Sequence, residues 1–342
     1  MEAFLWDRYA EIEPLGEGGM GKVVKARDIG LEREVAIKRL RHDLQDDQAP
    51  ERFLQEARAT GQLEHPNIPP IYEMGKDQDG NPYFALKLVR GLTLSEIIEK
   101  LDQGDPELHD RFPFIRRLEV FQKVCEAVAY AHKRGILHRD IKPENIMIGE
   151  FGEVLLVDWG LAKDQKPMKE NSNLTEAGTF VGTPMYAAPE QLCGESCSES
   201  CDVYSLGATL YEWLSLKQPY TEPNLRALLT AVLTKTPKDP VFFFHKVQGR
   251  LPVEMCRLVM KAMEKEPAKR FPSVAAMLEE VNDILAGEIR PLCPCTTVKF
   301  GFHNVSRLID NHPILVFLVI LWLLYPAYAL IWALYRAITA AG

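Results

Sequence analysis

Apolar and polar residues alternate along the amino-terminal part of the chain in the manner of β-strands. The alternation predicts strands over Tyr9–Leu15, Lys22–Ala26 and Val35–Leu40. Over Ala49–Leu63 the apolar positions are instead spaced three to four residues apart, which predicts a helix whose inner face includes Glu56. The first part of the chain is therefore expected to be rich in strands, with one helix.

Beyond Gly91 the helical spacing dominates. One segment lacks it: Asp164–Thr179 is polar and predicts a loop. For Asp105–Phe114 a solvated insertion is the default expectation. The segments with helical spacing are Leu118–Arg134, Ser205–Leu216, Leu225–Thr234 and Ser273–Leu285. We therefore expect the second part of the chain to be mainly α-helical.

The carboxyl-terminal region behaves differently. Gly287–Asn311 mixes Pro, Cys and polar residues and is interpreted as a juxtamembrane linker. Ile314–Tyr335 contains no charged residue and would be about 33 Å long as a helix, at ~1.5 Å per residue, which is enough to cross a bilayer. We expect a single span; a re-entrant hairpin turning at Pro326 and burial within the folded protein are the alternatives.

Composition narrows the classes of function. The chain has 342 residues and a formal net charge of -8, so no positive field is expected to attract nucleic acid. Residues 1–8 do not form an apolar leader, and the folded part is expected to be cytosolic with its cysteines reduced. Cys193, Cys197 and Cys201 recur every four residues and could bind a soft metal or form a redox pair, but ordinary thiols are expected.

A glycine cluster lies between the first two predicted strands. The spacing Gly16-x-Gly18-x-x-Gly21 occurs in dinucleotide-binding turns and in hairpins that cover phosphate groups. A strand pattern rather than a helix follows Gly21, which favours the hairpin, with Val23 placed over a flat base. Lys38 follows on a strand, where its ammonium group can reach the α and β phosphates and pair with Glu56.

The segment His138-Arg139-Asp140-Ile141-Lys142-Pro143-Glu144-Asn145 carries the strongest chemical signal. Asp140 can accept the proton of an incoming hydroxyl, and Lys142 can neutralise a transferring phosphoryl group. Asn145, together with Asp158 of the later triplet Asp158-Trp159-Gly160, supplies the oxygen ligands that Mg²⁺ prefers.

With these motifs in order, residues Tyr9 to Ala286 resemble the bacterial branch of the eukaryotic-like serine/threonine protein kinase family. Further matches are Gly182-Thr183-Pro184, Ala188-Pro189-Glu190, Asp202 and Arg270. The resemblance implies an α+β, bilobal protein kinase fold with a small β-rich lobe (1–90) and a large mainly α lobe (91–286). To these we add the linker (287–312), a transmembrane helix (313–336) and a short tail (337–342).

The resemblance also assigns roles to the residues. Asp140 would be the catalytic base, with Lys142 beside it; Lys38, paired with Glu56, would orient ATP; and Asn145 and Asp158 would hold Mg²⁺, with Mn²⁺ as an alternative. Glu190 and Arg270 would form a buried ion pair, and Asp202 would brace the catalytic loop. Residues expected to contact ATP are Gly16, Gly18, Gly21, Val23, Ala36, Lys38, Lys87 and Val89. Trp159 replaces the usual phenylalanine and is expected to affect how the triplet changes state.

Regulation and localisation complete the expectation. Arg139 precedes Asp140, a pattern that in the family couples activity to a phosphorylated loop, and Thr175 and Thr179 are the candidate autophosphorylation sites. The substrates would be Ser/Thr hydroxyls of proteins, and the partners would be the membrane and a second copy that phosphorylates in trans. We expect a single-pass cell-membrane protein with a cytoplasmic kinase domain; a pseudokinase scaffold and a small-molecule kinase are the alternatives.

Overall fold

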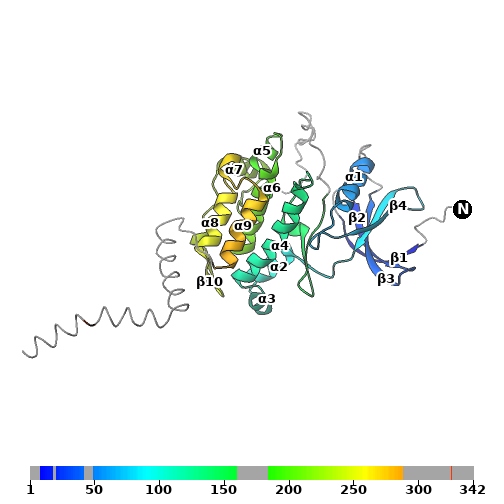
Figure 1. Ribbon diagram of the computed structural model, residues 1–342, viewed down its shortest axis with the longest axis horizontal. Helices are drawn as coiled ribbons and strands as arrows, with labels where there is room; N and C mark the ends of the chain where they lie inside the picture. Colours follow the sequence, from blue (N-terminus) through cyan, green and yellow to red (C-terminus); the bar gives the residue numbers. More distant parts are fainter. Residues whose placement is uncertain (1–7, 18–20, 42–48, 160–183, 288–324, 326–342) are drawn as a thin grey trace, which may run out of the picture. The chain divides into compact units, whose positions relative to one another are not determined.

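The computed structural model describes residues 8–17, 21–41, 49–159, 184–287 and 325 (Figure 1). The chain divides into two compact units, residues 1–286 and 287–342. Of the second unit only Gly287 and Tyr325 are described. The architecture below is therefore that of the first unit.

The amino-terminal lobe is built on a five-stranded antiparallel sheet with the strand order β1-β2-β3-β5-β4. Its strands alternate between two faces, as a period of two requires. One face buries a cluster that includes Val24, Ile37 and Tyr83, and the other buries Phe84 against helix α1. The elements are β1 (Tyr9–Glu17), β2 (Gly21–Asp28), β3 (Arg33–Leu40), α1 (Ala49–Gly61), β4 (Ile71–Lys76) and β5 (Pro82–Lys87).

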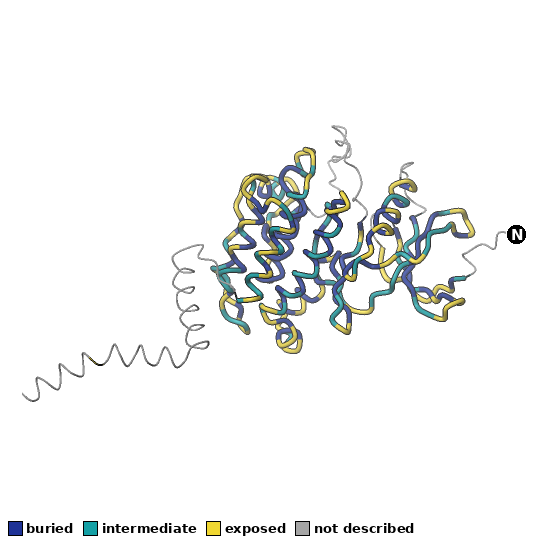
Figure 2. The backbone as a smooth tube through the Cα atoms, viewed as in Figure 1, coloured by how far each residue is buried: buried dark blue, intermediate teal, exposed yellow. Residues whose placement is uncertain are grey.

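The carboxyl-terminal lobe is helical and packs around α6, in which every residue from Cys201 to Ser215 is buried (Figure 2). A helix that is buried on all sides needs apolar side chains on most of its surface, and α6 has them. The elements are β6 (Gly91–Thr93), α2 (Leu94–Asp102), α3 (Pro106–Arg111), α4 (Phe114–His132), η2 (Pro143–Asn145), β7 (Ile146–Gly149), β8 (Val154–Leu156), η3 (Pro184–Tyr186), α5 (Pro189–Leu192), α6 (Glu199–Ser215), α7 (Leu225–Thr234), η4 (Pro240–Phe242), β9 (Phe244–His245), β10 (Gly249–Arg250), α8 (Val253–Ala262), η5 (Pro267–Lys269) and α9 (Val274–Leu285).

Helices α4 and α6 are joined by polar contacts at both ends. Near the carboxyl-terminal end of α4, His132 Nε2 lies 2.7 Å from Asp202 Oδ2 at the start of α6. Near its amino-terminal end, the buried guanidinium group of Arg117 donates to the carbonyl oxygens of Trp213 and Leu214 at 2.9 and 3.3 Å. A cation at the carboxyl end of a helix is favourable, because the last carbonyl groups have no partner within the helix.

The two-lobe prediction is confirmed, and the predicted helices and strands fall on observed elements whose ends differ by a few residues. The prediction of a solvated insertion over Asp105–Phe114 is wrong. This segment contains α3, whose Leu108 is buried, and Phe112 packs on Trp213 with ring centroids 5.5 Å apart. Asp105 caps this short helix and Pro106 begins it, so that Leu108 within the helix and Phe112 directly after it can be buried together.

The predicted loop Asp164–Thr179 lies outside the described residues, as does the predicted span Ile314–Tyr335 apart from Tyr325. Within the part of the chain that the structure describes, no helix has the length and apolar character needed to cross a membrane.

Candidate active site

The sheet places Lys38 on the face that packs against α1. Gly16 pairs with Val23, Val23 with Lys38, and Lys38 with Phe84, so these positions form one row across four strands. Directly opposed residues of antiparallel strands point to the same side of the sheet. The Lys38 side chain therefore shares its face with Phe84, which packs on Phe53 of α1.

The ammonium group of Lys38 bridges two carboxylates from different lobes. Its Nζ lies 2.5 Å from Glu56 Oε1 on α1 and 3.0 Å from Asp158 Oδ1 in the segment after β8. Burial acts to lower the pKa of Lys38, but the two carboxylates outweigh burial and raise it. Lys38 is therefore a permanent cation at the point where the lobes meet.

The pKa values of the two carboxylates shift in opposite directions. Burial raises the pKa of Glu56 to about 7. Burial also acts to raise the pKa of Asp158, but there the ammonium group of Lys38 outweighs burial and lowers it. Asp158 is thus ionised at neutral pH and available as a ligand for a cation.

A second cluster forms between α4 and β7. Lys142 Nζ lies 2.8 Å from Asp140 Oδ2, and Asn145 Nδ2 donates to the Asp140 carbonyl oxygen at 2.8 Å and to its Oδ2 at 3.1 Å. Because the amide nitrogen of Asn145 is used in this way, its amide oxygen is directed elsewhere and can serve as a metal ligand. Asp140 is positioned by both neighbours.

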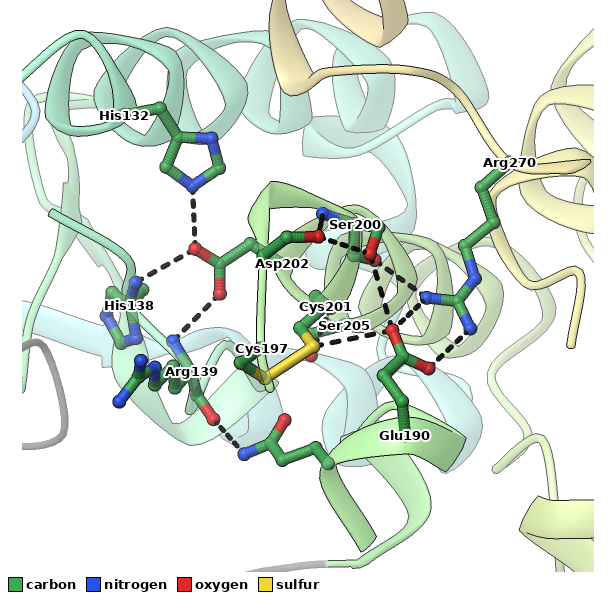
Figure 3. Close-up of a disulfide and its surroundings, with 12 residues drawn as sticks. His132, His138, Arg139, Glu190, Cys197, Ser200, Cys201, Asp202, Ser205 and Arg270 are labelled. Atoms are coloured by element: carbon green, nitrogen blue, oxygen red, sulfur yellow. Dashed lines mark hydrogen bonds and ion pairs between the residues drawn. A yellow bond between two sulfur atoms is a disulfide. The ribbon is translucent and has the colours of Figure 1, made fainter. Parts of the chain in front are cut away.

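Asp202 binds the backbone of the segment before Asp140 (Figure 3). Its Oδ2 accepts a hydrogen bond from the His138 backbone N–H and its Oδ1 accepts one from the Arg139 backbone N–H, each at 2.8 Å. Arg139 has a φ of +65°, a strained backbone conformation for a residue with a side chain. The carboxylate of Asp202, fully buried, supplies the contacts that maintain this conformation.

Trp159 follows Asp158, whose own φ is +64°. The indole ring is 1% exposed, lies 4.5 Å from the His138 ring between centroids, and donates from Nε1 to the Leu156 carbonyl oxygen at 3.2 Å. The ring therefore anchors the turn that presents the Asp158 carboxylate to Lys38.

Glu190 of α5 and Arg270 form a bidentate ion pair, with Arg270 Nη1 and Nη2 at 2.6 and 2.8 Å from the two carboxylate oxygens (Figure 3). The next residue, Gln191, donates from Nε2 to the Arg139 carbonyl oxygen at 2.8 Å. Through Gln191, the short helix α5 is joined directly to the loop that contains Asp140.

The comparison with known proteins agrees with this geometry. Residues 9–281 match the family described as Protein kinase domain. The chain belongs to the protein kinase family. The kinase is 38% identical over 305 residues to the serine/threonine-protein kinase PknD of Protochlamydia amoebophila, covering 84% of this chain and 31% of that protein. It is 35% identical over 318 residues to the serine/threonine-protein kinase PknD of Chlamydia caviae, covering 88% and 33% respectively.

These relatives place the kinase in the bacterial, eukaryotic-like serine/threonine branch. Members of the family use ATP and a divalent metal ion. The kinase spans about a third of the length of the curated relatives it matches.

Of the remaining residues predicted to contact ATP, Val23 and Ala36 share the face of Lys38, whereas Lys87 pairs with Val35 of the opposite face. Val23 is half-buried on β2, Ala36 is buried on β3, and Lys87 and Val89 lie at and after the end of β5. A Cβ atom added to Gly21 would lie 2.9 Å from the Arg39 carbonyl oxygen, so only glycine fits there. Three other predicted residues, Gly18, Thr175 and Thr179, lie outside the described residues.

Reasoning from the sequence did not identify His132 as the partner of Asp202. Burial acts to lower the pKa of His132, but the carboxylate of Asp202 outweighs burial and raises it. A signal was present, because His132 continues the apolar stripe of Cys125 and Val128 at helical spacing. An ionisable side chain on a buried stripe indicates a buried partner.

The expectation of ordinary reduced thiols is wrong for two of the cysteines. Cys197 and Cys201 form a disulfide, whereas Cys193 is free and exposed (Figure 3). The alternative of a soft-metal site finds no support, because the described residues contain no cluster of three or more His, Cys, Asp or Glu side chains arranged to hold a metal ion. The pair is close because Cys197 immediately precedes Ser198, the residue that caps α6, and Cys201 lies in the first turn.

Proposed function

We propose that the protein is a membrane-anchored serine/threonine protein kinase that transfers the γ-phosphoryl group of Mg-ATP to hydroxyl groups of protein substrates. The observation that carries the proposal is the bridge that the Lys38 ammonium group makes between Glu56 and Asp158, beside the hydrogen-bonded cluster of Asp140. A nucleotide-binding cation and a hydroxyl-activating carboxylate are the two parts that phosphoryl transfer requires.

Asp140 acts on the substrate hydroxyl group. Its Oδ2 already accepts hydrogen bonds from Lys142 and Asn145, so the carboxylate orientation is fixed before a substrate arrives. Asp140 then accepts the hydroxyl proton, while the ammonium group of Lys142 lies next to the transferring phosphoryl group and offsets its negative charge.

The nucleotide side of the site depends on Lys38, which Glu56 holds in position for the α and β phosphates. The Asn145 amide oxygen and the ionised Asp158 fit a magnesium ion, which usually takes one or two protein carboxylates together with substrate phosphates and water. A bound Mg²⁺ neutralises phosphate charge, and Mn²⁺ has compatible ligand preferences.

The first experiment compares the full-length protein in lipid nanodiscs with its Asp140→Asn variant, using Mg-ATP and a generic basic protein. We expect the variant to lose about 10²- to 10⁴-fold in phosphoryl transfer, the usual contribution of a general base, while it retains ATP binding. Asp110→Asn, on the exposed surface of α3, is the matched control and should keep full activity. Equal activity of all three proteins would refute the assignment.

Activation by phosphorylation of Thr175 or Thr179 is part of the proposal. A phosphate there would give Arg139 a charge-assisted partner next to the catalytic carboxylate, and two copies on one membrane could phosphorylate each other. Mass spectrometry of the full-length protein after incubation with Mg-ATP should find phosphate on these threonines, and the Thr175→Ala/Thr179→Ala variant should have a lower rate. An unchanged rate would exclude the mechanism.

Membrane anchoring is proposed from the apolar sequence Ile314–Tyr335, with the kinase part on the side that contains ATP. Carbonate extraction of cell membranes should leave the full-length chain in the pellet. The Leu321→Arg/Leu324→Arg variant should be released, because each arginine costs about 2.5–3.5 kcal/mol at the centre of a spanning helix. The Leu321→Ala/Leu324→Ala variant is the matched control; equal extraction of the arginine and alanine variants would contradict the proposal.

A further inference from the structure

The disulfide at the start of α6 lies between two polar networks, that of Glu190 with Arg270 and that of Asp202 with the segment before Asp140 (Figure 3). The sequence neighbours of Cys201 belong to these networks. The carbonyl oxygen of Ser200 accepts a hydrogen bond from Arg270 Nη1 at 2.9 Å, and the carboxylate of Asp202 accepts hydrogen bonds from the backbone of His138 and Arg139. Cys201 Sγ itself lies 3.4 Å from Glu190 Oε1. A change at this sulfur therefore acts on neighbours that hold the catalytic loop.

The two sulfur atoms differ in their access to solvent. Cys197 is half-buried and precedes the capping residue, whereas Cys201 is fully buried. Their Cα atoms are 5.8 Å apart, within the range of about 4.4–6.8 Å found for disulfides, so the bond can form without moving the backbone. Cys197 is the sulfur that an external reagent can reach, and Cys201 is the one that the fold protects.

We propose that Cys197 and Cys201 are a reversible thiol–disulfide site that reacts with low-molecular-weight disulfides, and that its oxidised form is the more active form of the kinase. In a reducing compartment, disulfides that do form are usually catalytic or redox-sensing. The effect on activity rests on the proposed kinase function, whereas the thiol chemistry does not.

The reaction with an external disulfide balances without a further reagent. The Cys197 thiolate attacks one sulfur of the external disulfide, forming a mixed disulfide and releasing one small thiolate. The Cys201 thiolate then attacks the Cys197 sulfur, forming the protein disulfide and releasing the second small thiolate. The external disulfide gains two electrons, and the two protons lost by the cysteines are taken up by the released thiolates.

The two states differ at Glu190. In the oxidised form Cys201 has no S–H group, and Glu190 Oε1 accepts from Arg270 Nη1 at 2.6 Å. In the reduced form the Cys201 thiol can donate to the same carboxylate oxygen, and the turn between the two cysteines is no longer covalently closed. Reduction is therefore expected to loosen the first turn of α6, which contains Asp202.

The free cysteine Cys193 gives a matched control. It lies four residues before Cys197, is exposed, and is not part of the disulfide. Burial and the carboxylates of Glu195 and Glu190 raise the pKa of Cys193, which disfavours the thiolate that would attack the neighbouring bond.

The test uses the full-length protein in nanodiscs, treated with an excess of oxidised glutathione or of dithiothreitol and then freed of reagent. Differential alkylation and mass spectrometry measure the bond, hydrogen exchange measures the His138 and Arg139 amides, and phosphorylation of a basic protein measures activity. On reduction we expect a fivefold or greater loss of kcat, little change in the KM for ATP, and exchange at these two amides at least fivefold faster.

Cys197→Ser should show the rate of the reduced wild type under both treatments, whereas Cys193→Ser should respond like the wild type. The proposal is overturned if oxidised glutathione does not form the bond, if the two forms have equal activity and amide exchange, or if the reduced form is faster. Should neither form phosphorylate a substrate, the proposed function fails, and bond formation with amide exchange still decides whether the thiol site exists and acts on the catalytic loop.

Discussion

Replacing Arg270 by methionine removes a guanidinium group in the carboxyl-terminal lobe whose N–H groups all have partners. A guanidinium group has five N–H donors, and here all are used: two on the Glu190 carboxylate and three on backbone carbonyl oxygens, at 2.6–2.9 Å. The Arg270 side chain has no exposed surface, and that of Glu190 is 8% exposed. Methionine retains part of the apolar stem and removes the positive charge together with the donors.

The loss of stability in the Arg270→Met variant follows from the Glu190 carboxylate, which stays buried without its partner. Breaking a buried ion pair on one side costs about 3–5 kcal/mol, because the other charge stays buried without a partner. The native state of a domain is stable by only about 5–15 kcal/mol, so the loss is a large fraction of the total. Adding Glu190→Gln removes the stranded charge, and the double variant should recover about 1–3 kcal/mol.

The assay is urea unfolding of the full-length protein in detergent micelles, followed by both far-UV circular dichroism and tryptophan fluorescence. With a denaturant slope of about 3 kcal/mol/M, a loss of 4 kcal/mol shifts the midpoint by ~1.3 M. Lys269→Met is the matched control, since the Lys269 Nζ to Glu266 Oε1 pair of 2.7 Å is largely exposed and should contribute almost nothing.

The reasoning would be refuted if Arg270→Met and Lys269→Met shifted the midpoint equally. It would also fail if the double variant were less stable than Arg270→Met alone, because an unpaired Glu190 would then not be the source of the loss.

Three further substitutions test other parts of the structure. Gly21→Ala should destabilise the sheet by about 1–3 kcal/mol, because its Cβ would meet backbone of β3, whereas Gly16→Ala has no atom within 4 Å and should be neutral; equal melting temperatures would contradict this. Phe112→Ala should cost about 3–5 kcal/mol in urea unfolding, and a negligible loss would restore the view of a solvated insertion. His132→Gln should destabilise more at about pH 5.5 than at about pH 9, because a pKa raised by Asp202 gives stability that is lost as pH rises through it; a pH-independent difference would exclude this linkage.

Parts of the site could be predicted where the hydrophobic periodicity and the order of the motifs along the chain agree. Strand alternation placed Lys38 on β3, and helical spacing placed Glu56 on the inner face of α1, so their ion pair could be anticipated. The order of His138, Asp140 and Asn145 indicated their shared loop in the same way.

Contacts that depend on distances between residues in the folded chain could not be predicted from the sequence. The disulfide requires a particular Cα separation, which the extended backbone at the capping residue Ser198 sets and which residue spacing alone does not reveal. Helix α3, with six residues, is too short for periodicity to identify, and the partner of the adjacent Phe112 is Trp213, which lies far along the chain. The contact of His132 with Asp202 joins two helices and is likewise invisible to a local pattern.

Helices α4 and α6 are expected to move together as one rigid body. Sliding one along the other would separate His132 from Asp202 at one end and pull Arg117 from the Trp213 carbonyl oxygen at the other, so each end resists the motion that the other would permit. The amino-terminal lobe joins this rigid body through the short connection of residues 88–90 between β5 and β6, and a few connecting residues of this kind can act as a hinge. Any change in the angle between the two lobes would therefore act on the Lys38 to Asp158 contact, which crosses from lobe to lobe.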